Sequence, residues 1–111
     1  MADFRELALQ VATATADRDS AVHLAGQIVA ARLAASAQVT GPVMSVAWHL
    51  GEMVTAEEWR VLLYTTKARY AELELALLDW HPWQNPQITA TPIVAGSAGC
   101  LAWLDESVAD R

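Results

Sequence analysis

The sequence predicts a mainly α protein: a small bundle of four or five helices that forms a single domain over residues 1–111. Three observations support this prediction. The chain is 54% hydrophobic and contains only 5 glycines and 4 prolines, a composition that excludes a disordered or low-complexity polymer. Two capping-box patterns mark expected helix starts, and apolar residues recur at helical spacing over the longest periodic segment, residues 55–80. A length of 111 residues leaves room for one ordinary domain.

The first two helices are expected over residues 4–15 and 20–36. Asp3 and Glu6 form a capping box, in which the acid at the helix start accepts a backbone N–H and the glutamate three residues later reaches back. Apolar side chains follow at helical spacing. The polar segment 17–20 offers several N-caps for the second helix, whose apolar residues cover most of its circumference. We therefore interpret the second helix as one packed in the middle of its own domain.

Residues 42–50 fit two structures, and the sequence leaves both open. Pro42 suits the first turn of a helix, where its missing N–H is not needed, and Gly51 suits the position just after a helix end. The alternation of apolar side chains that includes Val46 and Trp48 also fits a strand. A short helix is favoured, and a strand is the alternative.

The most strongly periodic segment, residues 55–80, is expected to form one long helix. It opens with a second capping box, Thr55 with Glu58, and it ends before His81 because the following proline moves that residue out of the helical region. A heptad-like spacing joins Trp59, Leu63, Thr66, Tyr70, Leu73, Leu77 and Trp80. A helix of about 26 residues is roughly 39 Å long, whereas a compact domain of this size has a radius of gyration of only ~13 Å. We therefore expect this helix to offer a partner surface, and a break at residues 65–66 is the alternative.

The sequence changes character after residue 80. Residues 81–86 form a loop bounded by prolines, and residues 87–95 are rich in Ile, Thr and Val, which predicts a short extended segment. Pro92 restricts this segment to a sheet edge or an extended arm, because proline has no N–H to donate to a strand ladder. Ser97 can cap a last short helix, which completes the expected set.

The charge balance and the apolar windows narrow the function. Seven basic against thirteen acidic residues leave a net charge of −6, which argues against a protein that grips nucleic acid through a general basic surface. Charges interrupt any signal-like run at the start, and the most apolar window, residues 21–39, contains several polar side chains. We therefore expect a cytoplasmic protein with no membrane segment. The one cysteine, Cys100, is expected to be a small buried apolar residue.

The sequence offers few groups for catalysis or metal binding. His49 and Glu52 lie three residues apart, and His23 and His81 lie elsewhere, but no zinc-binding motif is present and Gly51 separates the close pair. No glycine-rich phosphate loop and no nucleophile elbow occurs. We therefore predict a protein that is not an enzyme and holds neither a metal nor a cofactor.

One short segment is the basis of an alternative function, DNA binding, although direct contact with nucleic acid is not expected. Residues 54–63, Val-Thr-Ala-Glu-Glu-Trp-Arg-Val-Leu-Leu, resemble a segment common in MarR-type winged-helix regulators, and this resemblance implies a helix-turn-helix. That family's recognition helix and basic wing have no counterpart downstream. Glu57 and Glu58 would stand where such a helix approaches DNA phosphates and would be repelled. A helix-turn-helix transcriptional regulator is therefore kept as the alternative function.

The leading prediction is a small acidic, non-catalytic protein–protein interaction module, such as a regulator, adaptor or inhibitor. Its acidic charge suits a basic or nucleic-acid-binding partner protein. The heptad stripe of the long helix has two interpretations: it packs against a second copy in a homodimer, or the helices at residues 4–15 and 20–36 of the same chain cover it. Tryptophan and tyrosine are enriched at interaction hot spots. The residues predicted to bind a partner are Trp80, His81, Trp83, Tyr70, Leu73 and Leu77. A small enzyme or ligand-binding domain is the second alternative, after the helix-turn-helix regulator.

Overall fold

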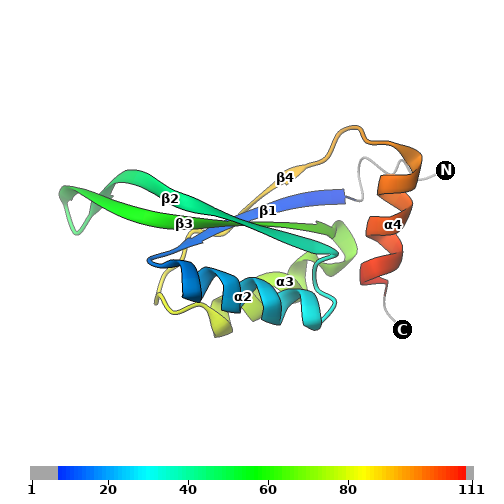
Figure 1. The fold of residues 1–111 in the computed structure, drawn as a ribbon, viewed down its shortest axis with the longest axis horizontal. Helices are drawn as coiled ribbons and strands as arrows, with labels where there is room; N and C mark the ends of the chain where they lie inside the picture. Colours follow the sequence, from blue (N-terminus) through cyan, green and yellow to red (C-terminus); the bar gives the residue numbers. More distant parts are fainter. Residues whose placement is uncertain (1–7, 110–111) are drawn as a thin grey trace.

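The protein, described over residues 8–109 by a computed structural model, has an α/β fold. Its strands are β1 (Ala8–Thr15), β2 (Ser36–His49), β3 (Glu52–Thr66) and β4 (Thr89–Pro92), and its helices are α2 (Arg18–Ala30), α3 (Lys67–Trp80) and α4 (Ala98–Val108). The strands form one antiparallel sheet in the order β2-β3-β1-β4. Figure 1 shows α2 and α3 on one face of this sheet and α4 at the end away from the β2–β3 turn. The predicted mainly α bundle was therefore wrong.

The core lies between the sheet and the helix pair α2 and α3. Its fully buried members include Val11, Leu24, Ile28, Val61, Leu63, Leu73 and Leu77. Burying one such side chain contributes roughly 1.5–3 kcal/mol, so this shared layer is the main source of stability. Outside the layer, the buried hydroxyl of Thr65 donates to the carbonyl oxygen of Leu33 at 2.7 Å and ties β3 to the segment that follows α2.

The helix expected over residues 4–15 is a strand wherever the structure describes it. β1 lies between β3 and β4, so both of its edges form ladder hydrogen bonds. Val11, Thr13 and Thr15 are buried at alternate positions, and their β-branched side chains suit a strand. Pairing with distant strands thus overrides the helical spacing. The capping box of Asp3 and Glu6 lies outside the described residues.

The helix expected over residues 20–36 is present as α2 with shifted ends. Asp17 is its N-cap and accepts the backbone N–H of Ser20 at 2.8 Å, as the polar segment before the helix predicted. The helix ends at Ala30, and Arg32 then adopts a φ of +58°, which turns the chain toward β2. Residues 31–35 of the expected helix are therefore a turn, and Ser36 begins β2.

Residues 42–50 belong to β2 and the turn that follows it, so the favoured short helix was wrong and the strand alternative was right. The ladder between β2 and β3 is interrupted only by an irregularity between Thr40 and Val43. Gly51 ends no helix: Leu50 and Gly51 form the tight turn of the hairpin, with φ values of +52° and +82°. Such positive values are what a two-residue hairpin turn requires.

The long helix expected over residues 55–80 is divided at Thr66, where β3 ends and α3 begins. The alternative break at residues 65–66 was therefore correctly placed, although the first half is a strand. Val61, Leu63 and Thr65 are buried at alternate positions, and this period-2 pattern coexists with the 3- and 4-residue spacing. The Thr55 capping box lies in mid-strand and caps no helix. A homodimer seam along one continuous helix is excluded by this division.

The C-terminal elements follow the sequence expectation more closely. β4 falls inside the expected extended segment and forms an outer strand of the sheet, beside β1. Ser97 caps α4, since its hydroxyl accepts the backbone N–H of Cys100 at 3.3 Å. None of the helices within residues 8–109 combines the length and the apolar character needed to cross a membrane.

Candidate functional site

Exposed apolar side chains gather on the distal arm, which we define as residues 43–58 of the β2–β3 hairpin. Met44, Val46 and Trp48 are two residues apart and therefore lie on one face of β2. Met53 is paired with Trp48 across the hairpin and joins this face. Trp48 is 78% exposed, and Leu50, at the turn, is 91% exposed. A tryptophan and its apolar neighbours are thus presented to the surroundings without cover from residues 8–109.

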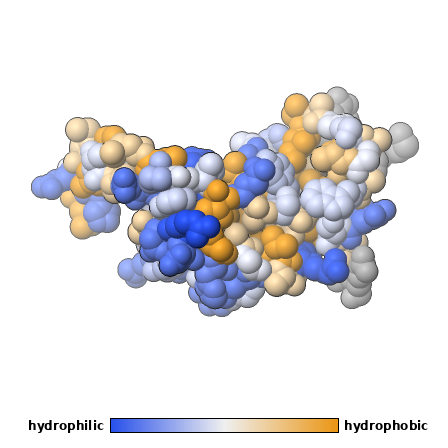
Figure 2. All heavy atoms as spheres, in the orientation of Figure 1, coloured by the Kyte–Doolittle hydropathy of each residue, from blue (hydrophilic) through white to orange (hydrophobic). Residues whose placement is uncertain are grey.

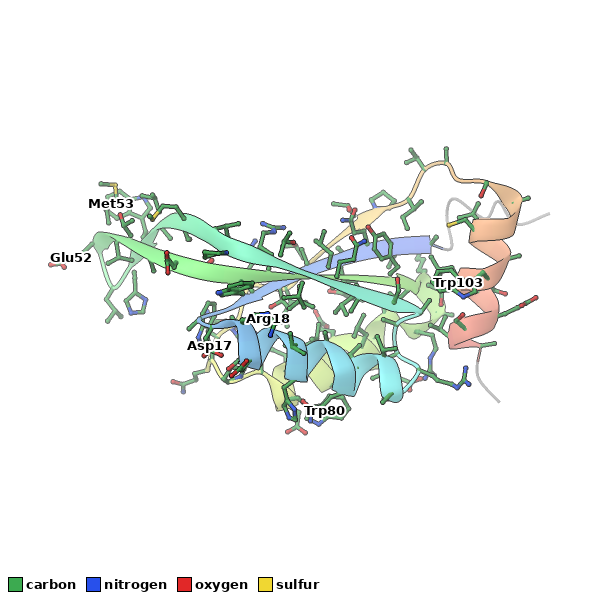
Figure 3. The ribbon with its side chains drawn as sticks, viewed as in Figure 1. Asp17, Arg18, Glu52, Met53, Trp80 and Trp103 are labelled. Carbon is green, nitrogen blue, oxygen red and sulfur yellow. The ribbon has the colours of Figure 1, made fainter. Side chains whose placement is uncertain are left out.

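The shape of the molecule separates this arm from the body. The principal dimensions are 48 × 25 × 21 Å, and the arm extends along the longest axis beyond the ends of α2 and α3 (Figure 1). Figure 2 shows apolar surface on the arm interspersed with hydrophilic side chains. In Figure 3, Glu52 and Met53 lie at its far end, remote from Trp103 on α4. The arm is therefore a candidate contact surface that projects from a packed domain.

The arm joins the body where the backbone of Gly41 packs closely against the ring of Trp59. A Cβ atom at this position would stand 2.6 Å from a ring carbon. The neighbouring Pro42 completes the interruption of the ladder after Thr40. Glycine is therefore required at this position to let the indole of β3 cover the backbone of β2.

A second candidate surface is a hollow of about 420 Å³ between α4 and the sheet face that α2 and α3 leave open. The sheet contributes Gln10, Gln38 and Tyr64, and α4 contributes Cys100 and Trp103. The described residues that line it carry no charge. Cys100 is exposed here, so the expectation of a buried cysteine was wrong. The hollow offers amide, phenol and thiol groups beside apolar walls.

The residues predicted to bind a partner are divided between core and surface. Leu73 and Leu77 are completely buried and pack inside this chain's own core. Tyr70 is half-buried, and its hydroxyl donates to a carboxylate oxygen of Glu74 at 3.2 Å. Burial raises the pKa of Tyr70 above its ordinary value, and the negative charge and hydrogen bond of Glu74 raise it further. These three side chains therefore stabilise α3 on the sheet.

The remaining predicted residues lie at the end of α3. Trp80 is partly exposed on the helix surface (Figure 3). His81 is only 7% exposed, and its Nε2 lies 2.7 Å from the carbonyl oxygen of Ala14. The backbone N–H of Trp83 donates to Nδ1 of the same ring at 3.0 Å. Burial lowers the pKa of His81, and the Ala14 carbonyl opposes this shift. A partner contact through Trp80 or Trp83 stays a prediction.

The candidate metal ligands do not gather into a site. His49 and Glu52 are paired across the hairpin turn, but no third ligand joins them, and within residues 8–109 no three His, Cys, Asp or Glu side chains cluster. Both ring nitrogens of His81 already have backbone partners. A divalent ion bound by protein alone needs three or more ligands. The described residues of one copy therefore do not fit a resident divalent ion.

Comparison with known proteins assigns the family. The model of a family described as "CutA1 divalent ion tolerance protein" matches residues 9–107. The chain belongs to the CutA1 family. The divalent-cation tolerance protein CutA of Escherichia coli O139:H28 is 29% identical over 92 residues, which cover 83% of this chain and 82% of that protein.

Solved CutA1 structures share the fold. CutA1 from Oryza sativa superposes with a TM-score of 0.91 at 24% identity, over 98% of this chain and 100% of that one. The divalent cation tolerance protein of Thermus thermophilus gives a TM-score of 0.87 at 29% identity, over 90% of this chain and 97% of that one. The α/β arrangement described above is thus the CutA1 fold.

Membership of the CutA1 family corrects the predicted function. The prediction of a helical regulator, adaptor or inhibitor was wrong, and so was its helix-turn-helix alternative, because the family is one of divalent-ion tolerance proteins. The stretch at residues 54–63 that resembles MarR-type regulators lies in β3 and forms no recognition helix. The names of the CutA1 relatives describe a tolerance and no catalysed reaction.

Sequence reasoning missed the distal arm as a surface although its signal was visible. The alternation through Val46 and Trp48 was noted, but Gly51 was interpreted as a helix end. A two-residue turn flanked by alternating apolar residues is the ordinary sign of a hairpin. A hairpin turn at Gly51 would have predicted both strands and the shared apolar face of the arm.

Proposed function

We propose that this CutA1-family chain serves in cellular tolerance of divalent cations, without catalysing a reaction and as a self-associated assembly. The observation that carries the proposal is the family match over residues 9–107, supported by the E. coli relative named for divalent-cation tolerance. The cytoplasmic location predicted from the sequence is retained in the proposal. No ion-binding step is assigned to a single copy, because its described ligands do not fit one.

Self-association is supported by the distal arm and by the sheet edge that it continues. Met44 and Leu50 expose 67% and 91% of their surface. Soluble proteins keep contiguous exposed apolar patches small, and a larger patch usually marks an interaction site. β2 is an outer strand of the sheet and is 14 residues long, so its free edge offers backbone groups for pairing. A second copy presents the same apolar face and the same edge. We therefore propose that copies of the chain cover one another's arms.

Growth on divalent salts tests the tolerance. A strain that lacks this chain should stop growing at lower copper, zinc or cobalt concentrations than the same strain with the chain restored. Sodium chloride at equal ionic strength is the control and should affect both strains alike. Equal growth of both strains over all divalent-salt series would contradict the proposed function.

Sedimentation tests the self-association separately. Met44→Glu places a charge on the apolar face of the arm and should shift the mass toward that of one chain at micromolar concentration. Leu75→Glu is the matched control, because Leu75 on α3 is also 67% exposed but lies outside the arm. A wild-type protein that sediments as a single chain at high micromolar concentration would refute self-association and leave the tolerance proposal standing.

A further inference from the structure

A buried imidazole joins the end of α3 to the end of β1. The backbone N–H of His81 closes α3 by donating to the carbonyl oxygen of Leu77 at 2.9 Å, and the next residue is Pro82. The ring then lies under β1, where Nε2 meets the Ala14 carbonyl and Nδ1 meets the Trp83 N–H. The rings of His81 and Trp83 lie 5.2 Å apart, tilted by 50°. One side chain thus contacts β1 and the loop that leads to β4.

These two partners determine the protonation state of the ring. A carbonyl oxygen only accepts, so Nε2 of His81 carries a hydrogen and donates it to Ala14. A backbone N–H only donates, so Nδ1 must be bare to accept from Trp83. Both contacts are satisfied together only by the neutral ring with its hydrogen on Nε2. A proton added to Nδ1 would point at another donor.

The same ring is the polar attachment of the loop between α3 and β4. Within residues 8–109, and apart from strand pairing, one hydrogen bond involves residues 82–88. It joins the Trp83 N–H to the ring of His81. Apolar contacts complete the attachment, because Pro86 is buried and Ile88 packs against the core. Loss of the His81 contact therefore leaves residues 82–85 without a polar anchor.

None of the residues that the structure describes forms an ion pair with the ring of His81. The charged residues nearest to the ring's contacts in sequence or strand register are Asp17, Arg18, Asp19, Glu58, Arg60 and Asp79. None of them hydrogen-bonds to His81, whose hydrogen-bond partners are both backbone groups. Glu58 and Arg60 line a small pocket with Ala14 on β1. An imidazolium at this position would exchange a satisfied neutral contact for a buried charge without a carboxylate partner.

We propose that His81 is an acid-released latch for residues 82–85: protonation of Nδ1 expels the Trp83 N–H and frees this part of the loop. The ligand is a proton taken up from solvent. Nδ1 changes from a hydrogen-bond acceptor to a donor, while Nε2 keeps its hydrogen. The direction of the pKa shift agrees, because burial makes the ring harder to protonate than a free histidine. The inference is independent of the divalent-cation proposal and depends on the contacts of this one ring.

Nuclear magnetic resonance of the full isotopically labelled chain tests the latch. The ring resonances of His81 should titrate with a midpoint below 6.5, the ordinary histidine value. The amide resonance of Trp83 should move with the same midpoint, because it loses its acceptor, while amides in the middle of α2 stay constant. A Trp83 amide that is unchanged across the His81 titration would overturn the proposal, as would a His81 midpoint at or above 6.5.

Two variants sharpen the result. His81→Gln should abolish the pH response of the Trp83 amide, since the glutamine side chain does not titrate. His49→Gln, at the exposed hairpin turn, is the matched control and should keep the wild-type response. A His81→Gln protein that still shows the response would refute the latch. If His81→Gln does not fold, the wild-type titration decides the question alone.

Discussion

The two halves of the β2–β3 hairpin share one alternating pattern of apolar side chains, but these side chains are buried in one half and exposed in the other. In the half nearer the body, Val39 packs against the core and Val61 and Leu63 are completely buried under α2 and α3. In the distal arm the same alternation places Val46 and Trp48 in the open. The pattern therefore specifies a face to be covered, and the described residues supply the cover for only one half. This uncovered half is the observation on which the proposed self-association depends.

The largest expected contrast comes from truncating one side chain in each half. Leu63→Ala should destabilise the protein by about 2–5 kcal/mol, because it leaves a cavity in a completely buried layer. Val46→Ala should change the stability of dilute, dissociated protein by less than about 0.5 kcal/mol, since its side chain is already exposed. Denaturant unfolding measures both values. Equal losses would mean that the arm is packed within a single chain.

The junction between the halves gives the next effect. Gly41→Ala should cost roughly 1–3 kcal/mol, because the new Cβ atom would overlap the Trp59 ring. Gly26→Ala in α2 is the control, since a Cβ atom there meets nothing within 4 Å. That control should stabilise the helix by about 0.5–1 kcal/mol. A thermal unfolding series in which both substitutions shift the midpoint in the same direction would contradict this account of the junction.

Removal of a predicted helix cap should have different effects on stability in the body and in the arm, and both effects should be smaller than those above. Asp17→Ala should destabilise the protein by about 0.5–2 kcal/mol, because it removes the acceptor for the Ser20 N–H. Thr55→Ala should be nearly neutral, although the sequence pattern predicted a cap, because Thr55 lies in mid-strand on the exposed arm. Urea midpoints of the two variants provide the measurement. A larger loss for Thr55→Ala would restore the capping interpretation.

The smallest expected effect is a pH dependence that belongs to the body alone. The folded chain holds the pKa of His81 below its ordinary value of 6.5, so the unfolded chain binds the proton first as pH falls. The stabilisation from the neutral ring is thus complete above pH 6.5 and is lost as pH falls from there to the lower folded-state value. Unfolding free energies measured from neutral to mildly acidic pH should show this slope in wild-type protein and in His49→Gln. His81→Gln should lack it, and an unchanged slope in that variant would assign the dependence to another group.

Sequence reasoning succeeded where the signal is local. The polar residues before α2 and Ser97 before α4 act through hydrogen bonds to their own neighbours, so both helix starts could be predicted. The extended segment that contains β4 followed from its composition and Pro92. The break at Thr66 was an open alternative and proved to be the boundary between strand and helix.

The remaining errors come from pairing over long distances in the chain. In residues 59–66 the helical spacing of Trp59 and Leu63 and the alternation of Val61 and Leu63 are both present, and only pairing with β1 and β2 selects the strand. Two residues of the predicted partner site were misplaced for the same reason, whereas a contact through Trp80 or Trp83 stays a prediction. Leu73 and Leu77 do form an apolar stripe, but a sheet that was not expected covers it.

The central position of β1 has a consequence for synthesis on the ribosome. Ala8 pairs with Thr66 and Leu9 pairs with Pro92. β1 is therefore synthesised well before the strands with which it pairs. The hairpin of β2 and β3 needs only its own residues and a tight turn, and its contacts are short-range in the chain. We therefore expect the nascent chain to form this hairpin before the sheet closes around β1. During that interval its apolar side chains would be the natural contact for a ribosome-associated chaperone.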